Sequence, residues 1–151
     1  MTLPAAYADL PLWPFGDSHE LQERLAALIV AGVKTAGCGA KDLNEWSEPG
    51  ERGLLVIRDT HPVALLEIET VEHMKFDEMS AEKAALEGEG DLSLEFWQEA
   101  HRKFFTRVTT FSEDMDVVFE TFRLVEILDQ DFAADAPRHV ALERAEAGVG
   151  A

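Results

Sequence analysis

Residues 54–71, LLVIRDTHPVALLEIETV, combine two apolar stretches with a turn between them. The first stretch, 54–58, is a compact apolar run, and the second, 63–71, alternates enough to indicate a strand. Between them, Asp59-Thr60-His61-Pro62 is typical of a turn. The stretch therefore predicts a β-hairpin.

The chain before this hairpin carries a helical segment and a short strand-like segment. Asp17 with Glu20 resembles a capping box, and the apolar residues that follow at helical spacing predict a helix ending near Gly32. Residues 33–39 are glycine-rich and typical of a short strand. Residues 1–16 are rich in proline and predict an extended arm, which apolar side chains pin onto the core: Leu10, Leu12, Trp13 and Phe15.

The chain after the hairpin contains two helical segments, an acidic loop and a last strand. Residues 80–86 predict a short helix, and Ser93 begins a longer one with an aromatic face. The loop 87–91 between them reads Glu-Gly-Glu-Gly-Asp. Residues 117–127 alternate and predict the last strand, whereas residues 129–151 predict a weakly helical or disordered segment.

Composition indicates one globular domain. A chain of 151 residues, 46% of them hydrophobic, buries about 70% of its extended surface on folding. We expect this domain to span residues 1–128, the arm included, and to be followed by an acidic, Ala-rich tail, 129–151. The single cysteine, Cys38, cannot form an intramolecular disulfide, which fits a reducing cytosol.

Charge and hydropathy exclude some classes of partner. The formal net charge of −17 opposes binding along a phosphate backbone, which usually requires a surplus of Lys and Arg. We therefore expect no DNA partner. No Lys or Arg precedes Arg24, and the longest apolar run, 25–33, is far shorter than a membrane span. These features predict a cytoplasmic protein without membrane insertion.

Lys34 is the first candidate for chemistry. It lies in Gly32-Val33-Lys34-Thr35, where the first helix ends and a strand begins. A Lys that is held there by backbone and partly withdrawn from water can act as a base or activate a hydroxyl. The alternative is a solvated Lys that the helix dipole favours at a C-terminus.

The acidic loop is the second candidate. Glu87, Glu89 and Asp91 alternate with glycines that allow close backbone approach. Like charges this close raise at least one pKa, which suits a general acid, and a nearby Lys would pair with one of them. The alternatives are an ordinary acidic loop and a divalent metal site. No His accompanies the carboxylates at ligand spacing, so we predict no metal and no cofactor.

Aromatic and basic residues provide candidate binding groups. His101 follows Trp97 by one helical turn, so both rings share a face and could border one pocket. A His packed at the rim of the core is the alternative. Trp46 is a candidate for stacking on a base and Arg58 for contacting a phosphate. Core packing is the alternative for the tryptophans.

These segments, in their order and spacing, resemble the ASCH domain family, and within it the small stand-alone bacterial proteins. The resemblance covers about residues 13–128. The following pieces carry it: Phe15-Gly16-Asp17-Ser18, Gly32-Val33-Lys34-Thr35-Ala36, Pro49-Gly50-Glu51, Phe76-Asp77-Glu78, the loop 87–91, Ser93-Leu94, Trp97, His101 and Phe104-Phe105.

The resemblance implies an α+β protein with a PUA-like fold, which is a small, mostly antiparallel β-barrel with surrounding α-helices and a cleft between barrel and helices. ASCH domains are associated with RNA and nucleosides, and one bacterial branch hydrolyses the amide of N4-acetylcytidine. The partner implied by the resemblance is thus a nucleoside or single-stranded RNA in the cleft.

In that branch a Lys, a Thr three residues later and a downstream Glu form the proposed catalytic set. The resemblance matches Lys34 to the Lys and Glu89 to the Glu, with Glu87 as the second choice. The Thr position falls on Gly37, so Thr35 or Cys38 would have to stand in for it.

Three functions follow as alternatives. In an amidohydrolase, Lys34 would be the base or activator, Glu89 the proton donor or orienting group, and Thr35 the hydroxyl. The second is a non-catalytic RNA or modified-nucleoside binding module, and the third is a divalent-ion-dependent ribonuclease. The substrate-binding candidates are Glu87, Trp97, His101, Arg58 and Trp46.

Overall fold

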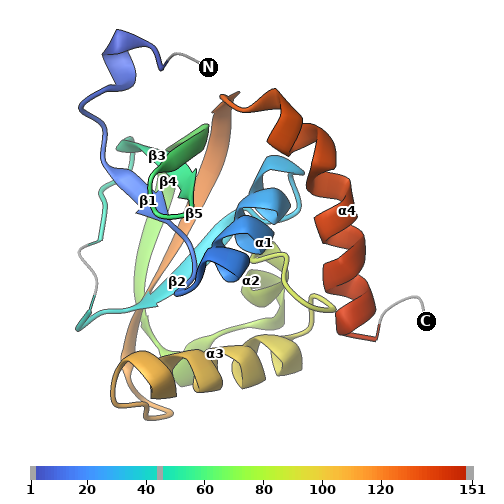
Figure 1. The fold of residues 1–151 in the computed structure, drawn as a ribbon. Helices are drawn as coiled ribbons and strands as arrows, with labels where there is room; N and C mark the ends of the chain where they lie inside the picture. The colour runs from blue at the N-terminus through green and yellow to red at the C-terminus, as the bar shows by residue number, and fades with distance from the viewer. Residues whose placement is uncertain (1–2, 44–45, 149–151) are drawn as a thin grey trace.

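Five strands form one mixed sheet in the computed structural model, which describes residues 3–43 and 46–148 (Figure 1). The strands are β1 (Leu12–Pro14), β2 (Ala36–Ala40), β3 (Arg52–Ile57), β4 (His61–Lys75) and β5 (Asp116–Ile127). They pair in the order β1-β3-β4-β5-β2, with β1 parallel to β3 and all other neighbours antiparallel.

The sheet is open, unlike the barrel that the resemblance implies. Its edge strands, β1 and β2, span 3 and 5 residues and are not paired with each other within the described ranges. A barrel closes only when both edges of the sheet are hydrogen-bonded to one another. The α+β class is as predicted, and the closed barrel is not formed.

The helices lie beside this sheet and across one end of it (Figure 1). They are α1 (His19–Val30), α2 (Ala81–Leu86), α3 (Leu94–Val108) and α4 (Gln130–Glu146), with 3-10 turns at Ala5–Tyr7 and Phe76–Glu78. α1 lies between the sheet and α4, and α3 runs across the lower end in this view. No helix in the described part of the chain combines the length and apolar character needed to cross a membrane.

The predicted hairpin is formed by β3 and β4, and its apolar run reflects burial on both faces. Leu55 and Ile57 belong to the core cluster beneath α1. Leu54 and Val56 belong to a second cluster, against which residues of the N-terminal arm pack. Because successive side chains of a strand point to opposite faces, a strand covered on both sides reads as continuously apolar.

The first helix begins one residue later than the capping box suggests. Ser18 is the N-cap, and its hydroxyl accepts a hydrogen bond from the Leu21 amide at 3.1 Å. Asp17 instead pairs with Arg107 of α3 at 3.1 Å. Gly32 follows the helix with φ +83°, a left-handed conformation that favours glycine. This turn directs Val33 and Lys34 back toward the core.

The aromatic face of α3 packs on the lower part of the sheet. Phe105 and Trp97 of α3 are buried with Phe76 and with Val117 and Phe119 of β5. The rings of Phe76 and Trp97 stack with centroids 5.1 Å apart. This packing places His101, one turn after Trp97, against the interior.

Residues 130–146 form α4, so the helical alternative expected for this segment is the one that the structure has. Pro137 lies inside the helix, where it removes a backbone donor. Tertiary contacts therefore have to stabilise it, and α4 packs along α1. The last residues of the expected tail, 149–151, lie outside the described ranges.

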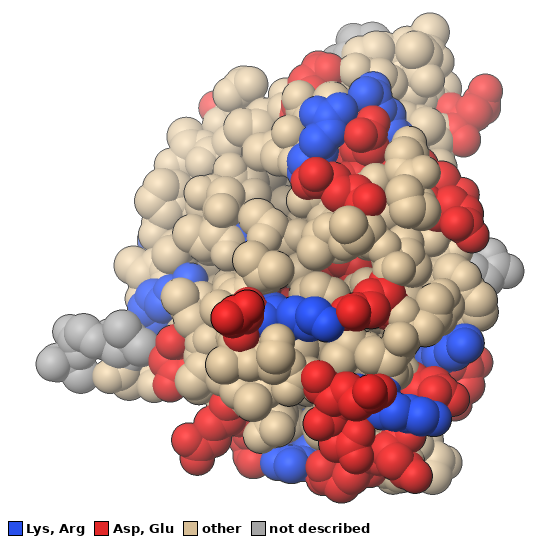
Figure 2. Space-filling view, turned by 180° about the vertical axis from the view of Figure 1, so that it is seen from behind, with Lys and Arg blue, Asp and Glu red and all other residues tan. Residues whose placement is uncertain are grey.

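Acidic residues outnumber basic ones in the chain, 30 to 13. Figure 2 shows the face opposite to that of Figure 1, where Asp and Glu cover more area than Lys and Arg and gather densely at the end occupied by α3. The 3-10 turn Phe76–Glu78 and the loop before β5 meet there through a hydrogen bond from the Asp77 amide to the Glu113 carbonyl at 3.0 Å.

Candidate active site

Lys34 is drawn into the interior by the turn that ends α1. The amides of Val33 and Lys34 both donate to the Leu28 carbonyl, at 3.0 and 3.1 Å. The next amide, of Thr35, donates to the Leu86 carbonyl at the end of α2 at 2.8 Å. Lys34 is only 2% exposed as a result, so the solvated alternative for this residue does not hold.

The Lys34 ammonium contacts both carboxylates of the acidic loop. Its Nζ lies 2.9 Å from Glu89 Oε2 and 3.5 Å from Glu87 Oε1. It also donates to the carbonyls of Ala36 at 2.8 Å and Glu87 at 3.3 Å. Lys34, Glu87, Glu89 and His101 are called the charged cluster below.

Glu87 is the most enclosed member of the charged cluster. The residue is 1% exposed, and its Oε2 accepts a hydrogen bond from the Trp97 indole Nε1 at 2.5 Å. Its Oε1 faces Lys34 and also His101, whose Nε2 lies 3.5 Å away. Glu87 therefore links the end of α2 to both cations and to α3.

The hydrogen bonding of His101 indicates its charge state. Its Nδ1 lies 2.9 Å from the Trp97 carbonyl, which can only accept, so Nδ1 carries a proton. Neutral His101 would then point a lone pair at the Glu87 carboxylate, whereas the imidazolium points an N–H at it. Burial, the largest single effect, lowers the pKa of His101, but the charge and hydrogen bond of Glu87, the charge of Glu89 and the Trp97 carbonyl together raise it above the ordinary value.

The charges of the cluster balance each other. Burial favours the neutral form of Glu87, but the positive charges of His101 and Lys34 lower its pKa to about 2. Burial similarly lowers the pKa of Lys34, and Glu89 and Glu87 more than compensate and raise it. Two cations thus face two carboxylates, and Lys34 is held as an ammonium at neutral pH. The role of base that its burial suggested does not fit this geometry.

The glycines beside Glu89 are required by the shape of the loop. Gly88 and Gly90 have φ values of +70° and +60°, which are strained for other residues. A Cβ atom on Gly88 would lie 2.2 Å from the Val33 carbonyl oxygen, and one on Gly90 would lie 2.3 Å from the Phe96 ring. The loop therefore packs its backbone directly on the turn that carries Lys34.

A pocket of about 420 Å³ adjoins Lys34. Its size falls within the range of roughly 300–1,000 Å³ that is typical of small-molecule sites. Of the charged cluster, Lys34 alone lines it, together with apolar and polar residues from α1, α2, β4 and β5. These are Ile29, Gly32, Thr35, Glu69, Leu86, Thr121, Phe122, Arg123 and Leu124.

Gly37 occupies the position that carries Thr in the branch of the family that the sequence resembles. Gly37 lies on β2, and a Cβ atom there would come within 3.2 Å of the Phe15 ring. A Thr at this position would require the Phe15 ring to shift by a few tenths of an ångström. Cys38 does not offer a reactive substitute, because burial and the nearby charge of Glu87 raise the pKa of its thiol well above the ordinary value.

The other predicted site residues divide into two groups. Thr35 borders the pocket, and its hydroxyl lies 3.3 Å from the Leu86 carbonyl. Arg58 and Trp46 lie outside the charged cluster and do not line the pocket. Arg58 pairs with Glu23 at 3.7 Å, and Trp46 packs edge-on against His73 with centroids 4.9 Å apart. Their predicted contacts with a base and a phosphate have no geometric support.

The structure brings His101 to the acidic loop, which sequence spacing did not indicate. Ligand atoms of Glu87, Glu89 and His101 all lie within 4.8 Å of one another. This set could in principle bind a divalent cation, but the Lys34 ammonium already contacts both carboxylates. A metal ion would have to replace or repel Lys34, so the geometry favours an ion-pair cluster over a metal centre.

Two residues that support the site were missed in the sequence. Glu143 and Arg144 of α4 hydrogen-bond to the backbone of the acidic loop. They lie in the segment expected to be weakly helical or disordered. Their charges were the only available signal, and spacing gives no means of pairing them with a loop more than 50 residues earlier.

Glu120 is a half-buried acid on β5, opposite Gly37. Burial raises its pKa to about 7, and the charge of Glu51 adds to this. The folded protein then retains a proton that the unfolded chain loses above its ordinary pKa of 4.5, so this group costs stability as the pH rises toward 7. We expect Glu120→Gln to raise the Tm at pH 8 and to leave it unchanged at pH 4, by calorimetry.

The control for this experiment is Glu69→Gln, which changes an exposed carboxylate on the neighbouring strand β4. It should shift the Tm little at either pH. An equal gain for Glu120→Gln at both pH values would show that the effect is unrelated to titration of the carboxyl group.

The fold and the charged cluster define a small α+β domain in which a buried Lys is held by two carboxylates of one glycine-rich loop. A family model described as the ASCH domain matches residues 11–126. The chain belongs to this family, which is PUA-like and generally associated with RNA.

Solved structures agree with this assignment. The crystal structure of an ASCH domain from Lactobacillus crispatus is 32% identical with a TM-score of 0.72, covering 80% of this chain and 82% of that one. The crystal structure of protein EF3133 from Enterococcus faecalis is 29% identical with a TM-score of 0.70, covering 79% and 82%. A search of the curated proteins gave no match.

Proposed function

We propose that the protein takes a nucleoside, free or within single-stranded RNA, into the pocket beside Lys34. We further propose that it hydrolyses the amide of N4-acetylcytidine or of a related acylated pyrimidine nucleoside. The observation that carries this proposal is the pairing of the Lys34 ammonium with Glu89 at 2.9 Å, in which Glu89 keeps 18% of its side chain exposed.

The geometry suggests separate roles for the two residues. Glu89 does not line the pocket itself, but it contacts Lys34, which does, and it is the more accessible carboxylate of the charged cluster. In this proposal it accepts a proton from the attacking water. The water oxygen bonds to the acetyl carbonyl carbon, and the carbonyl electron pair moves to an oxyanion that the Lys34 ammonium stabilises. The oxyanion electron pair re-forms the carbonyl, the C–N bond breaks, and Glu89 returns the proton to N4. The products are cytidine and acetic acid, which releases its proton to solvent as acetate.

The chemistry of the pocket suits a nucleoside better than a long polyanion. Apolar side chains such as Leu86 and Phe122 provide surface for a base, and Thr35 and Thr121 provide hydroxyl groups. A neutral nucleoside is not repelled by a protein of net charge −17. The acidic surface in Figure 2 disfavours tight, sequence-independent binding of long RNA.

A second candidate function is recognition of a modified nucleoside or RNA without hydrolysis. It is favoured by the replacement of the Thr by Gly37, over which Phe15 packs. It is also favoured by the four acceptors around the Lys34 ammonium, which leave no N–H uncommitted.

The test is incubation of the purified protein with N4-acetylcytidine, with cytidine release followed by chromatography. We expect release, and we expect Glu89→Gln to lower kcat about 100-fold, because the amide cannot accept the proton from water. Glu99→Gln is the matched control, since Glu99 is a 63% exposed carboxylate on α3.

Binding is measured in parallel by calorimetry with N4-acetylcytidine. Saturable binding without release by folded wild-type protein would exclude the hydrolase and support the recognition module. Neither binding nor release would contradict both candidate functions for this nucleoside.

A further inference from the structure

Two residues near the C-terminal end of α4 hydrogen-bond to the loop 87–91, which carries both carboxylates of the charged cluster. The Arg144 guanidinium donates from Nη1 to the carbonyls of Gly88 and Gly90, at 2.8 Å each. Glu143 accepts a hydrogen bond from the Gly90 amide at 2.8 Å. Arg144 and Glu143 therefore hydrogen-bond to three backbone groups of the two glycines that flank Glu89.

The same turn of α4 is tied to α1. Arg24 of α1 donates to Glu143 at 2.9 Å and to Glu146 at 3.0 Å. Both Arg24 and Glu143 are mostly buried, with 18% and 14% of their side chains exposed. Hydrogen bonds between ionised groups are stronger than those between neutral groups. The residues of α4 that contact the loop are thus also bound to α1, the helix that precedes Lys34.

The conformation and the charge of this loop both oppose its order, so contacts from elsewhere have to stabilise it. Gly88 and Gly90 have high backbone freedom in the unfolded chain and adopt left-handed conformations here. Glu87, Glu89 and Asp91 repel one another, and Lys34 contacts only the first two. The Arg144 charge adjoins this loop and lowers the pKa of Asp91, after the larger effect of hydrogen bonds from Ser93.

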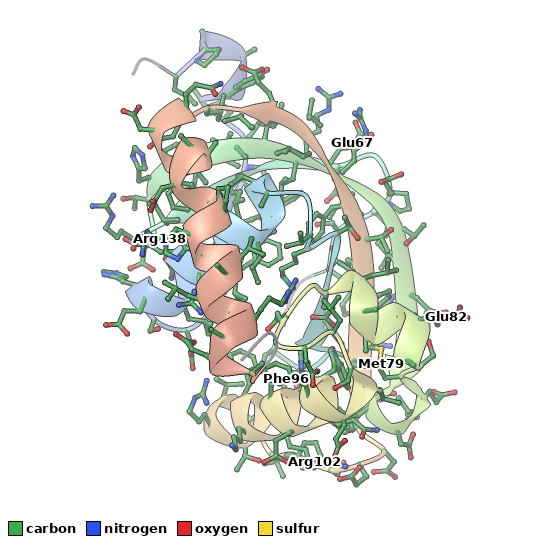
Figure 3. All side chains as sticks on the ribbon, turned by 90° about the vertical axis from the view of Figure 1, so that its right-hand side faces the viewer. Glu67, Met79, Glu82, Phe96, Arg102 and Arg138 are labelled. Carbon is green, nitrogen blue, oxygen red and sulfur yellow. The ribbon has the colours of Figure 1, made fainter. Side chains whose placement is uncertain are left out.

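We propose that Arg144 and Glu143 are positioning residues that fix Glu89 relative to Lys34, and this inference rests on the proposed function. α4 spans residues 130–146, beyond the residues 11–126 that match the family model. The site of this protein is therefore completed by a helix outside the matched part of the domain. Figure 3, viewed onto α4, shows its lower end beside Phe96 at the start of α3.

The test compares Arg144→Ala with Arg138→Ala. Arg138 is on the same helix, pairs with Asp135 at 2.7 Å and is 58% exposed; in Figure 3 it projects to the side of α4 away from Phe96. Hydrogen exchange is measured by NMR at the Gly90 amide. We expect exchange at least about tenfold faster in Arg144→Ala and unchanged in Arg138→Ala. Unchanged Gly90 exchange in a folded Arg144→Ala protein would overturn the proposal.

The second readout is kinetic and uses N4-acetylcytidine. Arg144 does not line the pocket, so we expect Arg144→Ala to lower kcat about tenfold with KM within twofold of wild type. Arg144→Lys should recover most of both readouts, because an ammonium can donate to both carbonyls. A loss confined to KM, or no recovery in folded Arg144→Lys, would overturn the positioning role.

The two readouts separate this inference from the proposed function. If wild-type protein does not hydrolyse or bind the nucleoside, the function fails, and Gly90 exchange still decides whether α4 holds the loop. If wild-type protein is active and Arg144→Ala keeps full kcat, the positioning role fails and the function stands.

Discussion

We expect Lys34→Met to lower the free energy of unfolding at pH 7 by about 3–5 kcal/mol, which is the usual cost of breaking a buried ion pair by removing one partner. Met keeps the length and most of the apolar stem of the side chain. The ammonium contacts with Glu89 and Glu87 are lost, and two carboxylates then face one remaining cation, His101. The measurement is urea unfolding followed by fluorescence.

Two further variants isolate the charge effect. Lys103→Met removes a 71% exposed Lys that pairs with Glu99 on α3, and it should change stability by less than about 0.5 kcal/mol. Adding Glu89→Gln to Lys34→Met should recover part of the loss, because one unpaired carboxylate is removed with it. A loss below about 1 kcal/mol for Lys34→Met would mean that the cluster does not depend on the ammonium.

The fold was predictable where local pattern and tertiary environment agree. The hairpin of β3 and β4, the helix α1 and the strand β5 follow from apolar periodicity and turn residues. Whether the sheet closes into a barrel or stays open was not predictable, because this depends on whether the short edge strands β1 and β2 pair with each other. The formation of α4 could not be predicted either, because Pro137 and a weak apolar pattern disfavour a helix in this segment. Its stability comes from contacts with α1 and the acidic loop.

The candidate site was predictable in part for a similar reason. Lys34 and Glu89 were chosen by residue type and by resemblance, and they lie in contact. The approach of His101 to Glu87 depends on how α3 docks onto the sheet, which one sequence does not specify. Trp46 and Arg58 were chosen by residue type alone. Each contacts a residue outside the charged cluster, Trp46 with His73 and Arg58 with Glu23. Residue type identified the charged groups, and only packing could show which of them meet.

Acid should destabilise the protein steeply below pH 4.5, and Glu87 should account for much of the slope. Its pKa is about 2 in the folded protein and 4.5 ordinarily. A carboxyl whose folded pKa is lowered contributes stability above the unfolded pKa, and this is lost as the pH falls through the interval between the two. The difference corresponds to about 3 kcal/mol. Protonation would leave Lys34 and His101 facing only Glu89.

Urea unfolding of wild type and Glu87→Gln at pH 7, 5, 4 and 3 measures this contribution. At pH 7 the variant should be less stable by about 3 kcal/mol, since Gln cannot accept from Trp97 and also neutralise Lys34 and His101. The difference should shrink steadily below pH 4.5, because wild type loses the same charge on protonation. Glu99→Gln, at an exposed site on α3, should run parallel to wild type at every pH. A constant difference between wild type and Glu87→Gln from pH 7 to 3 would show that Glu87 contributes hydrogen-bond geometry and not its charge.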